Sequence, residues 1–153
     1  METLGAALER EHREIDAGIE AFTSGLAEGK ADPAPLAGAI AALRRHIYLE
    51  EEFLFPPLRP QMMAPVFVML REHGEMWATL DALDAQLAAG GADASMANAC
   101  HELVAELERH NGKEEQIIYT VADELLSAEA SAALQAFIDS GQMPEGWVCA
   151  KAS

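Results

Sequence analysis

The sequence predicts an all-α fold, namely an up-down-up-down antiparallel four-helix bundle followed by a short fifth helix and a C-terminal tail. Three observations lead to this prediction. Helix-favouring Ala, Leu, Glu and Met are plentiful, whereas β-branched residues are sparse. Four long segments carry apolar residues at the three- and four-residue spacing of one helix face. Short turn signals separate these segments, which favours antiparallel neighbours.

The first helix is expected over about residues 3–27, where His12 completes an apolar stripe formed by Leu4, Leu8, Ile15, Ile19, Phe22 and Leu26. The second helix is expected to open at 32–35, where Asp32 or a neighbour caps it and proline lies in its first turn. It should end at 56–57, because proline lacks a backbone donor and its ring blocks the preceding turn. Its inner face carries Leu36, Ile40, Leu43, His46, Glu50 and Phe53 or Leu54.

The third helix is expected to begin within 61–65 and to end at 90–91. Its stripe consists of Val66, Met69, Leu70, His73, Trp77, Leu80, Leu83 and Leu87. The fourth helix should run from a cap at Asp93 or Ser95 to about Leu126. Its stripe consists of Met96, Cys100, Leu103, Leu107, His110, Glu114, Ile117, Val121 and Leu125.

The shorter fifth helix is expected over 127–139, with a packing face made of Leu134, Phe137 and Ile138. The tail, 140–153, is read as a loop that folds back through Trp147. Because the chain has 153 residues and no low-complexity linker, a single domain is expected over 1–153, with the bundle at about 3–126.

Composition argues against several classes of partner. The chain has 10 basic and 26 acidic residues and a formal net charge of −16. Nucleic acid and anionic membrane surfaces are therefore disfavoured, because both require a basic footprint. No apolar run is long enough to span a membrane, and charges interrupt the N-terminal segment, so that no secretory signal is read. With only Cys100 and Cys149 for thiols, a reduced cytoplasmic setting is expected.

Histidines and glutamates at related positions of the four long helices predict a two-metal site inside the bundle. Residues four apart on a helix project from one face, one turn apart. Counting residues from each turn places all six side chains in one layer. A lone histidine in an apolar stripe is more often a hydrogen-bonded core residue, and a His-x-x-x-Glu pair is more often exposed. The joint pattern favours metal binding by His12, His46, Glu50, His73, His110 and Glu114.

The donor types restrict the metal. Imidazole nitrogen and carboxylate oxygen together favour iron, manganese or zinc over calcium or magnesium. Two bridging carboxylates and two histidines for each ion leave positions open for water, an oxo bridge or a diatomic ligand. His101 falls on the opposite helix face and is read as a surface residue, and Trp77 is read as core. Tyr48 and Tyr119 lie off the metal-facing positions, although a tilt could bring Tyr119 near.

These segments resemble the hemerythrin-like superfamily, the HHE cation-binding domains. The matching sequence segments are EHREID around His12, HIYLEEEFLFP from His46, REHGEM around His73 and HNGKEEQIIY from His110. The resemblance covers about residues 3–126. It implies an up-down-up-down bundle around a non-haem diiron centre. It also implies that the four histidines are terminal ligands, and that the bridges between the irons are Glu50 and Glu114.

One departure bears on function. Oxygen-carrying hemerythrins place a second histidine four residues after the third-helix histidine, and Trp77 holds that position here. The remaining set is similar to that of the iron-centre repair proteins of the superfamily, which respond to nitric oxide and oxidative damage. The N-terminal cysteine-bearing domain of those proteins is not read in this chain. Both reversible oxygen transport and a full repair function are therefore disfavoured.

The expected function is that of a cytoplasmic non-haem diiron protein that binds or senses oxygen, nitric oxide or peroxide, or takes part in iron homeostasis. Manganese and zinc stay open as native metals. One alternative is a diiron redox enzyme (an oxidase, peroxidase or nitric oxide reductase) or an iron donor for damaged iron centres. A second alternative is a structural bundle without metal. The sequence names no organic substrate and no redox partner.

Overall fold

The computed structural model describes residues 2–90 and 93–152, and within these ranges all regular secondary structure is helical. The all-α prediction is confirmed, and the helices begin close to where the sequence places them. In chain order the elements are α1 (Leu4–Ala27), α2 (Ala34–Leu49), η1 (Glu50–Leu54), α3 (Phe55–Leu58), α4 (Met63–Ala88), α5 (Ala94–Lys113), η2 (Glu114–Ile118), α6 (Tyr119–Leu125) and α7 (Ala128–Ser140). The segments η1 and η2 are π-helical turns inside longer helices.

Polar side chains start several helices as the sequence suggests. Thr3, Asp93 and Ser127 are the N-caps of α1, α5 and α7, and each accepts a backbone N–H of the first turn. These bonds satisfy donors that have no partner within the helix. At α2 the N-cap is Pro33, which makes no side-chain bond, and Asp32 instead accepts the first helical N–H at 3.0 Å.

The predicted end of the second helix is wrong, because the helix continues through Pro56 and Pro57 to Leu58. At η1 the backbone N–H of Phe55 donates to the carbonyl of Glu50, five residues back. The two prolines follow this widened turn and lie in the first turn of α3. The change of hydrogen-bond register at this turn coincides with the two residues that cannot donate a backbone hydrogen bond.

A second π-helical turn changes which residues of the fourth long helix face the core. At η2 the backbone N–H of Tyr119 donates to the carbonyl of Glu114. The extra residue in this turn rotates the following positions relative to a regular α-helix. The prediction that Ile117 faces the core is therefore wrong, because Ile117 is 46% exposed. Ile118 and Tyr119 are buried instead.

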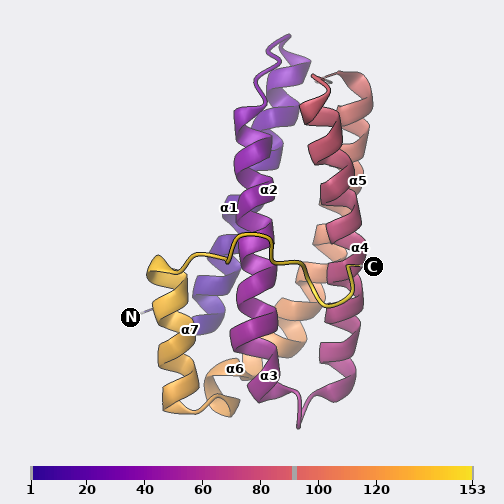
Figure 1. Cartoon of the computed structure of the whole chain (residues 1–153). Coiled ribbons are helices and arrows are strands. Elements are labelled where there is room, and N and C mark those ends of the chain that lie inside the picture. Colours follow the sequence, from indigo (N-terminus) through magenta and orange to yellow (C-terminus); the bar gives the residue numbers. More distant parts are fainter. Residues whose placement is uncertain (1, 91–92, 153) are drawn as a thin grey trace.

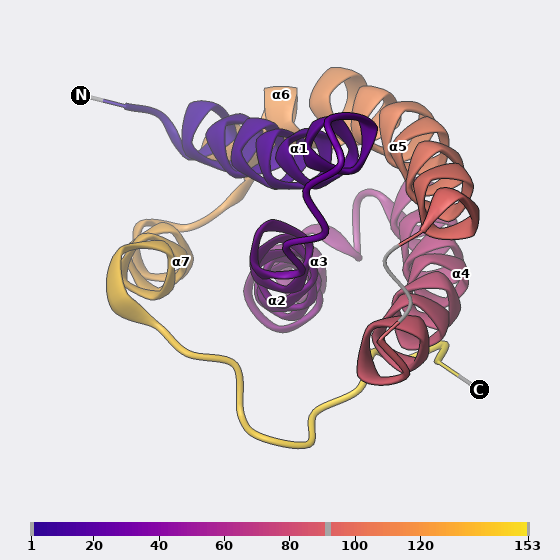
Figure 2. The same ribbon diagram turned by 90° about the horizontal axis from the view of Figure 1, so that it is seen from above.

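The long helices run side by side (Figure 1). Helix α1 packs against α2, α5 and α6, and α4 packs against α5 and α2. The α1–α2 connection lies at the same end as the end of α4 and the start of α5, and the α3–α4 connection lies at the other end (Figure 1). Helix α7 lies beside α1 and α2, outside the interior seen down the bundle in Figure 2. Among the described helices, none combines the length and hydropathy needed to cross a membrane.

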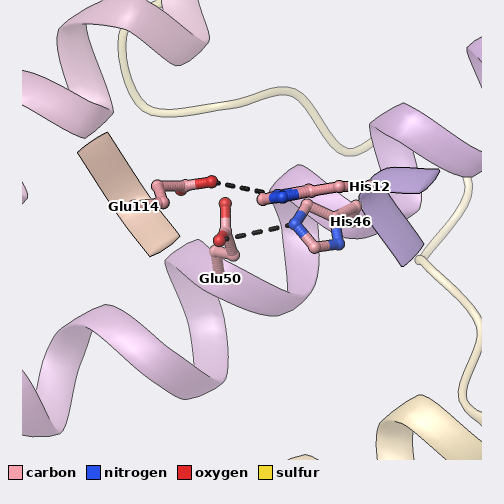
Figure 3. Close-up of side chains that lie close together, drawn as sticks. All are labelled: His12, His46, Glu50 and Glu114. Carbon is pink, nitrogen blue, oxygen red and sulfur yellow. Dashed lines mark ion pairs between the residues drawn. The ribbon is translucent and has the colours of Figure 1, made fainter. Parts of the chain in front are cut away.

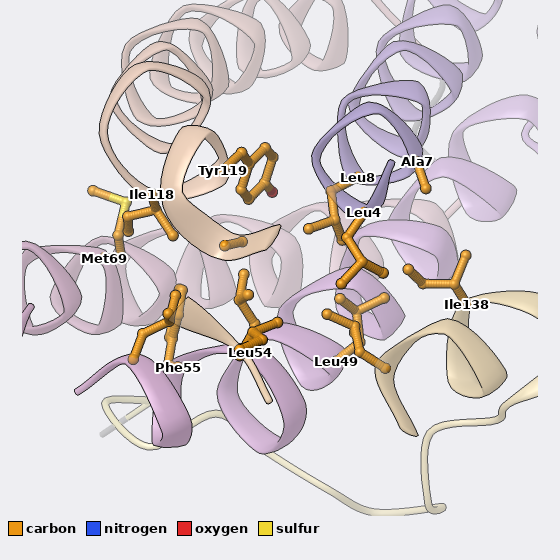
Figure 4. Packing of buried hydrophobic residues seen from close by; sticks show 14 of the residues in the cluster. Leu4, Ala7, Leu8, Leu49, Leu54, Phe55, Met69, Ile118, Tyr119 and Ile138 are labelled. Carbon is orange, nitrogen blue, oxygen red and sulfur yellow. The ribbon is translucent and has the colours of Figure 1, made fainter. Parts of the chain in front are cut away.

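Two apolar clusters fill the interior, one on each side of a polar layer. The first cluster includes Leu8 of α1 and Leu70 of α4, together with the residues drawn in Figure 4. The second cluster includes Ile15 of α1 and Met76 of α4. Because His12 and His73 fall between these pairs, the predicted site residues are enclosed by apolar side chains at both ends of the bundle.

The C-terminal tail crosses the bundle from α7 over α2 to α4 (Figures 1 and 2). The tail contacts the bundle through Trp147, whose indole N–H donates to Glu52 Oε1 at 3.2 Å. The Trp147 ring packs edge-on against Tyr48 and Trp77, with ring centroids 5.0 and 5.6 Å apart. The prediction that the tail folds back through Trp147 is confirmed, as is the core position of Trp77, which is 4% exposed.

Replacing Gly74 by alanine is expected to lift the end of the tail from α4. A Cβ at Gly74 would lie 2.2 Å from the backbone oxygen of Lys151, and backbone cannot rotate away as a side chain can. We expect a loss of about 1–3 kcal/mol of stability, as for other overpacked sites. The buried thiol of Cys149 should then react faster with a thiol reagent, while the core thiol of Cys100 stays protected.

The matched control is Gly38→Ala. Gly38 is also helical but has open space where its Cβ would lie. This change should leave the labelling of Cys149 unchanged and stabilise the helix by up to about 1 kcal/mol. Equal labelling rates of Cys149 in the two variants would show that the tail does not depend on close approach at Gly74.

Candidate metal centre

The structure brings the six predicted side chains together in one buried layer, and none of them is more than 3% exposed. Their ligand atoms form two groups, within each of which all atoms lie within 4.8 Å of one another. We call these groups the first subsite (His12, His46, Glu50 and Glu114) and the second subsite (Glu50, His73, His110 and Glu114). Both glutamates belong to both groups, which is the arrangement that two bridged ions require.

Glu114 divides its two oxygens between the subsites. Its Oε1 lies 3.2 Å from His12 Nε2 in the first subsite, shown in Figure 3, and its Oε2 lies 3.1 Å from His110 Nε2 in the second. Although Oε2 is buried, it makes no well-aligned hydrogen bond with any residue of the described ranges. A buried carboxylate oxygen that accepts no hydrogen bond is costly. A cation between Oε2 and the histidines would remove that cost, so the residues fit a metal.

Glu50 divides its oxygens in the same way. Its Oε2 lies 3.4 Å from His46 Nε2, and the two residues are one helical turn apart where α2 continues into η1 (Figure 3). Its Oε1 lies 3.1 Å from His73 Nε2, on α4. Each glutamate therefore presents one oxygen to each subsite, and each subsite has two imidazole nitrogens and two carboxylate oxygens.

Four further glutamates, which we call the outer carboxylates, fix the orientation of the imidazole rings. Carboxylates only accept hydrogen bonds, so each Nδ1 carries the proton and donates it. Each Nε2 is thereby turned toward the centre, as in many metal sites where a carboxylate holds a ligating histidine. The pairs are His12 with Glu115 at 2.8 Å, His46 with Glu11 at 2.8 Å, His73 with Glu51 at 2.8 Å and His110 with Glu72 at 2.9 Å.

These hydrogen bonds form a closed ring around the bundle. A glutamate of α1 accepts a hydrogen bond from the histidine of α2, and a glutamate of η1 accepts one from the histidine of α4. A glutamate of α4 accepts one from the histidine of α5, and a glutamate of η2 accepts one from the histidine of α1. Sequence reasoning missed all four outer carboxylates. The signal that could have found them is adjacency, because each one is next in sequence to a predicted ligand: Glu11 to His12, Glu51 to Glu50, Glu72 to His73 and Glu115 to Glu114.

Three of the outer carboxylates have further support. Arg45 donates to Glu11 at 3.2 Å and also to the carbonyl of Phe137 at 2.6 Å, at the end of α7. Lys113 forms a short ion pair with Glu72. The backbone N–H of Ala150, in the tail, donates to Glu51 at 2.9 Å. The tail and α7 are thus connected to the ring through these carboxylates.

Replacing Glu51 by glutamine is expected to weaken metal binding about 10–100-fold, as is typical when the partner of a ligating histidine is changed. The amide can still accept a bond from His73, but it lacks the charge that makes the imidazole a stronger ligand. The matched control is Glu52→Gln, which removes the same charge from the next residue, where the partner is Trp147 rather than a histidine. Equal metal affinities of the two variants, measured by chelator competition, would contradict this role.

Tyr119 is the site residue that the sequence placed wrongly. Its Oη lies 3.0 Å from His12 Nε2 and 3.1 Å from His46 Nε2, and it donates to Glu50 Oε2 at 2.5 Å. Glu114 Oε1 is 3.2 Å away. The phenol therefore lies inside the first subsite, because the π-helical turn η2 rotates Tyr119 inward. Burial and the carboxylates of Glu114 and Glu50 raise the pKa of Tyr119 well above its usual range.

The close carboxylates also determine the charge of the histidines. Burial by itself would favour neutral imidazole, but carboxylates, Glu50 foremost, raise the pKa of His46 to about 10. Burial would also lower the pKa of His73, but the facing carboxylates raise it well above its usual value. The pKa of His110 is raised in the same way. Burial would raise the pKa of Glu114, but facing histidines, His110 above all, hold it well below its usual range.

Metal affinity is therefore expected to rise with pH. A ligating Nε2 must lose its proton, and the raised pKa of about 10 keeps His46 protonated at neutral pH in protein without a cation. The pKa values of His73 and His110 are shifted in the same direction. Binding then releases protons, so raising the pH from about 6 to about 8 should strengthen binding. Calorimetry in two buffers of different ionisation enthalpy would measure the released protons. Binding without proton release would contradict the prediction.

A cleft between α1 and α5 reaches the edge of the first subsite. Its volume is about 760 Å³, and His12 contributes to its lining. Acidic side chains dominate its charged groups, since Asp16, Glu20, Glu108 and Glu115 outnumber the cationic Arg13. His101, read from the sequence as a surface residue, is exposed and also lines it. The acidic lining of this cleft, at the edge of the first subsite, suits a cation.

Comparison with known proteins agrees with the geometry. The family model for the hemerythrin HHE cation-binding domain matches residues 3–122. No curated protein and no solved structure is a significant match to the chain. The matched segment spans well over half of the sequence and contains all six residues of the two subsites. The chain therefore belongs to the hemerythrin HHE cation-binding domain family.

Proposed function

We propose that this protein holds two metal ions side by side in an up-down-up-down four-helix bundle. The histidines of one ion are His12 and His46, those of the other are His73 and His110, and both ions share the two glutamates. The observation that supports this proposal most strongly is the division of oxygens, in which each glutamate faces both subsites. A site for one ion would have no use for a second pair of inward-facing imidazoles.

We propose iron as the native metal. Two imidazoles with carboxylate oxygen and open positions are typical of non-haem iron sites. The closed ring of outer carboxylates adds negative charge around the ligands, which favours a cation of high charge. The cytoplasmic setting that we also propose would be reducing and would make iron available as the ferrous ion. Manganese and zinc are the competing metals for the same donor set.

The function that we propose is binding or sensing of a small ligand, such as oxygen, nitric oxide or peroxide, or a part in iron homeostasis. A pair of irons held by these residues would supply open coordination positions and redox chemistry. The protein supplies apolar clusters on both sides of the centre, which exclude bulk water, and a cleft that reaches the first subsite. Trp77, which replaces the additional histidine of the oxygen carriers, lies in the second cluster and provides no ligand atom.

The test is the optical spectrum of protein loaded anaerobically with ferrous iron, then exposed to oxygen and returned to vacuum. A visible band that appears with oxygen and disappears under vacuum would support ligand binding. Irreversible conversion to a stable ferric spectrum would instead favour the redox enzyme or the iron donor. If iron produced no spectral change and did not bind, the proposal of an iron centre would be wrong.

A further inference from the structure

The two long helices that carry a glutamate of the centre repeat one local arrangement. In each, a histidine is followed four residues later by the glutamate, and the glutamate opens a π-helical turn. Five residues after the glutamate comes an aromatic residue whose backbone N–H closes that turn. The repeated sets are His46, Glu50 and Phe55 in one helix and His110, Glu114 and Tyr119 in the other.

The two aromatic rings occupy corresponding places in the two subsites. Phe55 stacks on His73 of the second subsite, with ring centroids 5.6 Å apart and an interplanar angle of 21°. Tyr119 stacks on His12 of the first subsite at 5.4 Å and 28°. Both rings are buried, at 2% and 3% exposure. The principal chemical difference between these two ring positions is the hydroxyl group of Tyr119.

The position of this hydroxyl is that of a metal ligand. Atoms that bind one ion at about 2.0–2.2 Å and at right angles to each other are separated by about 3 Å. Tyr119 Oη has this separation from both imidazole nitrogens of the first subsite, at 3.0 and 3.1 Å. It also lies 3.2 Å from Glu114 Oε1 and 2.5 Å from Glu50 Oε2, the oxygen to which it donates its hydrogen bond. An ion within reach of His12, His46, Glu50 and Glu114 would therefore also be within reach of Tyr119.

We propose that Tyr119 Oη is a fifth protein ligand of the ion in the first subsite, which makes the two ions of the centre chemically different. The inference rests on the proposed function, since it requires both subsites to bind iron. The oxygen binds ferric iron in exchange for its proton, which leaves to solvent, and no electron is transferred. The first ion then has five protein ligands and the second has four, so most exchangeable positions belong to the second ion, beside Phe55.

The test is the visible and resonance Raman spectrum of the ferric protein. Phenolate bound to ferric iron gives a charge-transfer band and enhanced ring vibrations that imidazole and carboxylate do not give. The chain has two tyrosines, so the assignment is direct. We expect the band in the wild type and its complete loss in Tyr119→Phe, with two irons per chain retained. The matched control, Tyr48→Phe, should keep the band, because Tyr48 packs on Phe53, Phe137 and Trp147 rather than at the centre.

A second variant transfers the hydroxyl to the other ring. In the double variant Phe55→Tyr with Tyr119→Phe, we expect the phenolate band to return, now from the second subsite. Its absence would overturn the correspondence of the two ring positions. Retention of the band by Tyr119→Phe, or its absence from wild type with two ferric ions bound, would overturn Tyr119 as a ligand while leaving the proposed function intact. A wild type that binds no iron would instead overturn the proposed function.

Discussion

Replacing Glu114 by alanine is expected to remove both metal ions, not one. Its two oxygens face different subsites, so each ion loses a charged ligand at once. The affinity of each subsite should fall by more than about 100-fold, the upper end of what changes outside the ligand shell cost. Metal analysis after gel filtration would then find almost no iron in the variant. Glu50→Ala should behave in the same way, because Glu50 also faces both subsites.

The control variant is His110→Ala, which removes a ligand of the second subsite only. It distinguishes the loss of a bridging ligand from the loss of a ligand that binds one ion. This variant should keep the ion of the first subsite and bind about one ion per chain. Circular dichroism would show that each variant retains its helices. If Glu114→Ala kept one tightly bound ion, as His110→Ala is expected to, then Glu114 would not bridge.

Removing the metal is expected to lower the melting temperature by tens of degrees. An ion present at a thousandfold excess over its Kd stabilises the folded state by about 4 kcal/mol. For a chain of this size each kcal/mol corresponds to about 2–4 °C, so two ions should give a shift of about 15–30 °C. A structural bundle that binds no metal would melt at the same temperature with and without a chelator.

The size of this shift should depend on pH, and the sign follows from the histidines. In chelated protein the pKa of His46 is raised to about 10, and that of His73 is also raised. Their stabilisation is fully present below the ordinary histidine pKa of about 6.5 and is lost as the pH rises toward about 10. The chelated protein should therefore melt lower at pH 9.5 than at pH 7, whereas the loaded protein, whose histidines are held by metal, should change less.

The helices and their inner faces were largely predictable, because apolar periodicity directly reflects burial. The stripe of α1 illustrates this, since His12 completes it and is buried with Leu8 and Ile15. The site also followed from this periodicity, because a histidine that interrupts an apolar stripe must point inward. Counting along helices placed Glu50 and His73 less closely than the structure does, where their atoms are 3.1 Å apart. That the six residues bind metal stays a prediction.

The π-helical turns were not predictable, and most of the errors follow from them. A π-helical turn differs from an α-helical turn by one hydrogen-bond register and has no distinctive composition. Regular helical geometry after Glu114 placed Ile117 inside and Tyr119 away from the metal. The extra residue of η2 reverses both assignments. The outer carboxylates were missed for another reason: Glu11 or Glu115 in isolation has the sequence pattern of an ordinary solvent-facing residue.

A crystal structure of iron-loaded protein, with anomalous data at the iron edge, tests most directly whether two ions share Glu50 and Glu114. Two anomalous peaks are expected, one beside Nε2 of His12 and His46 and one beside Nε2 of His73 and His110. Both peaks should contact oxygens of both glutamates. A single peak, or two peaks that do not share a glutamate, would show that Glu50 and Glu114 do not bridge two ions.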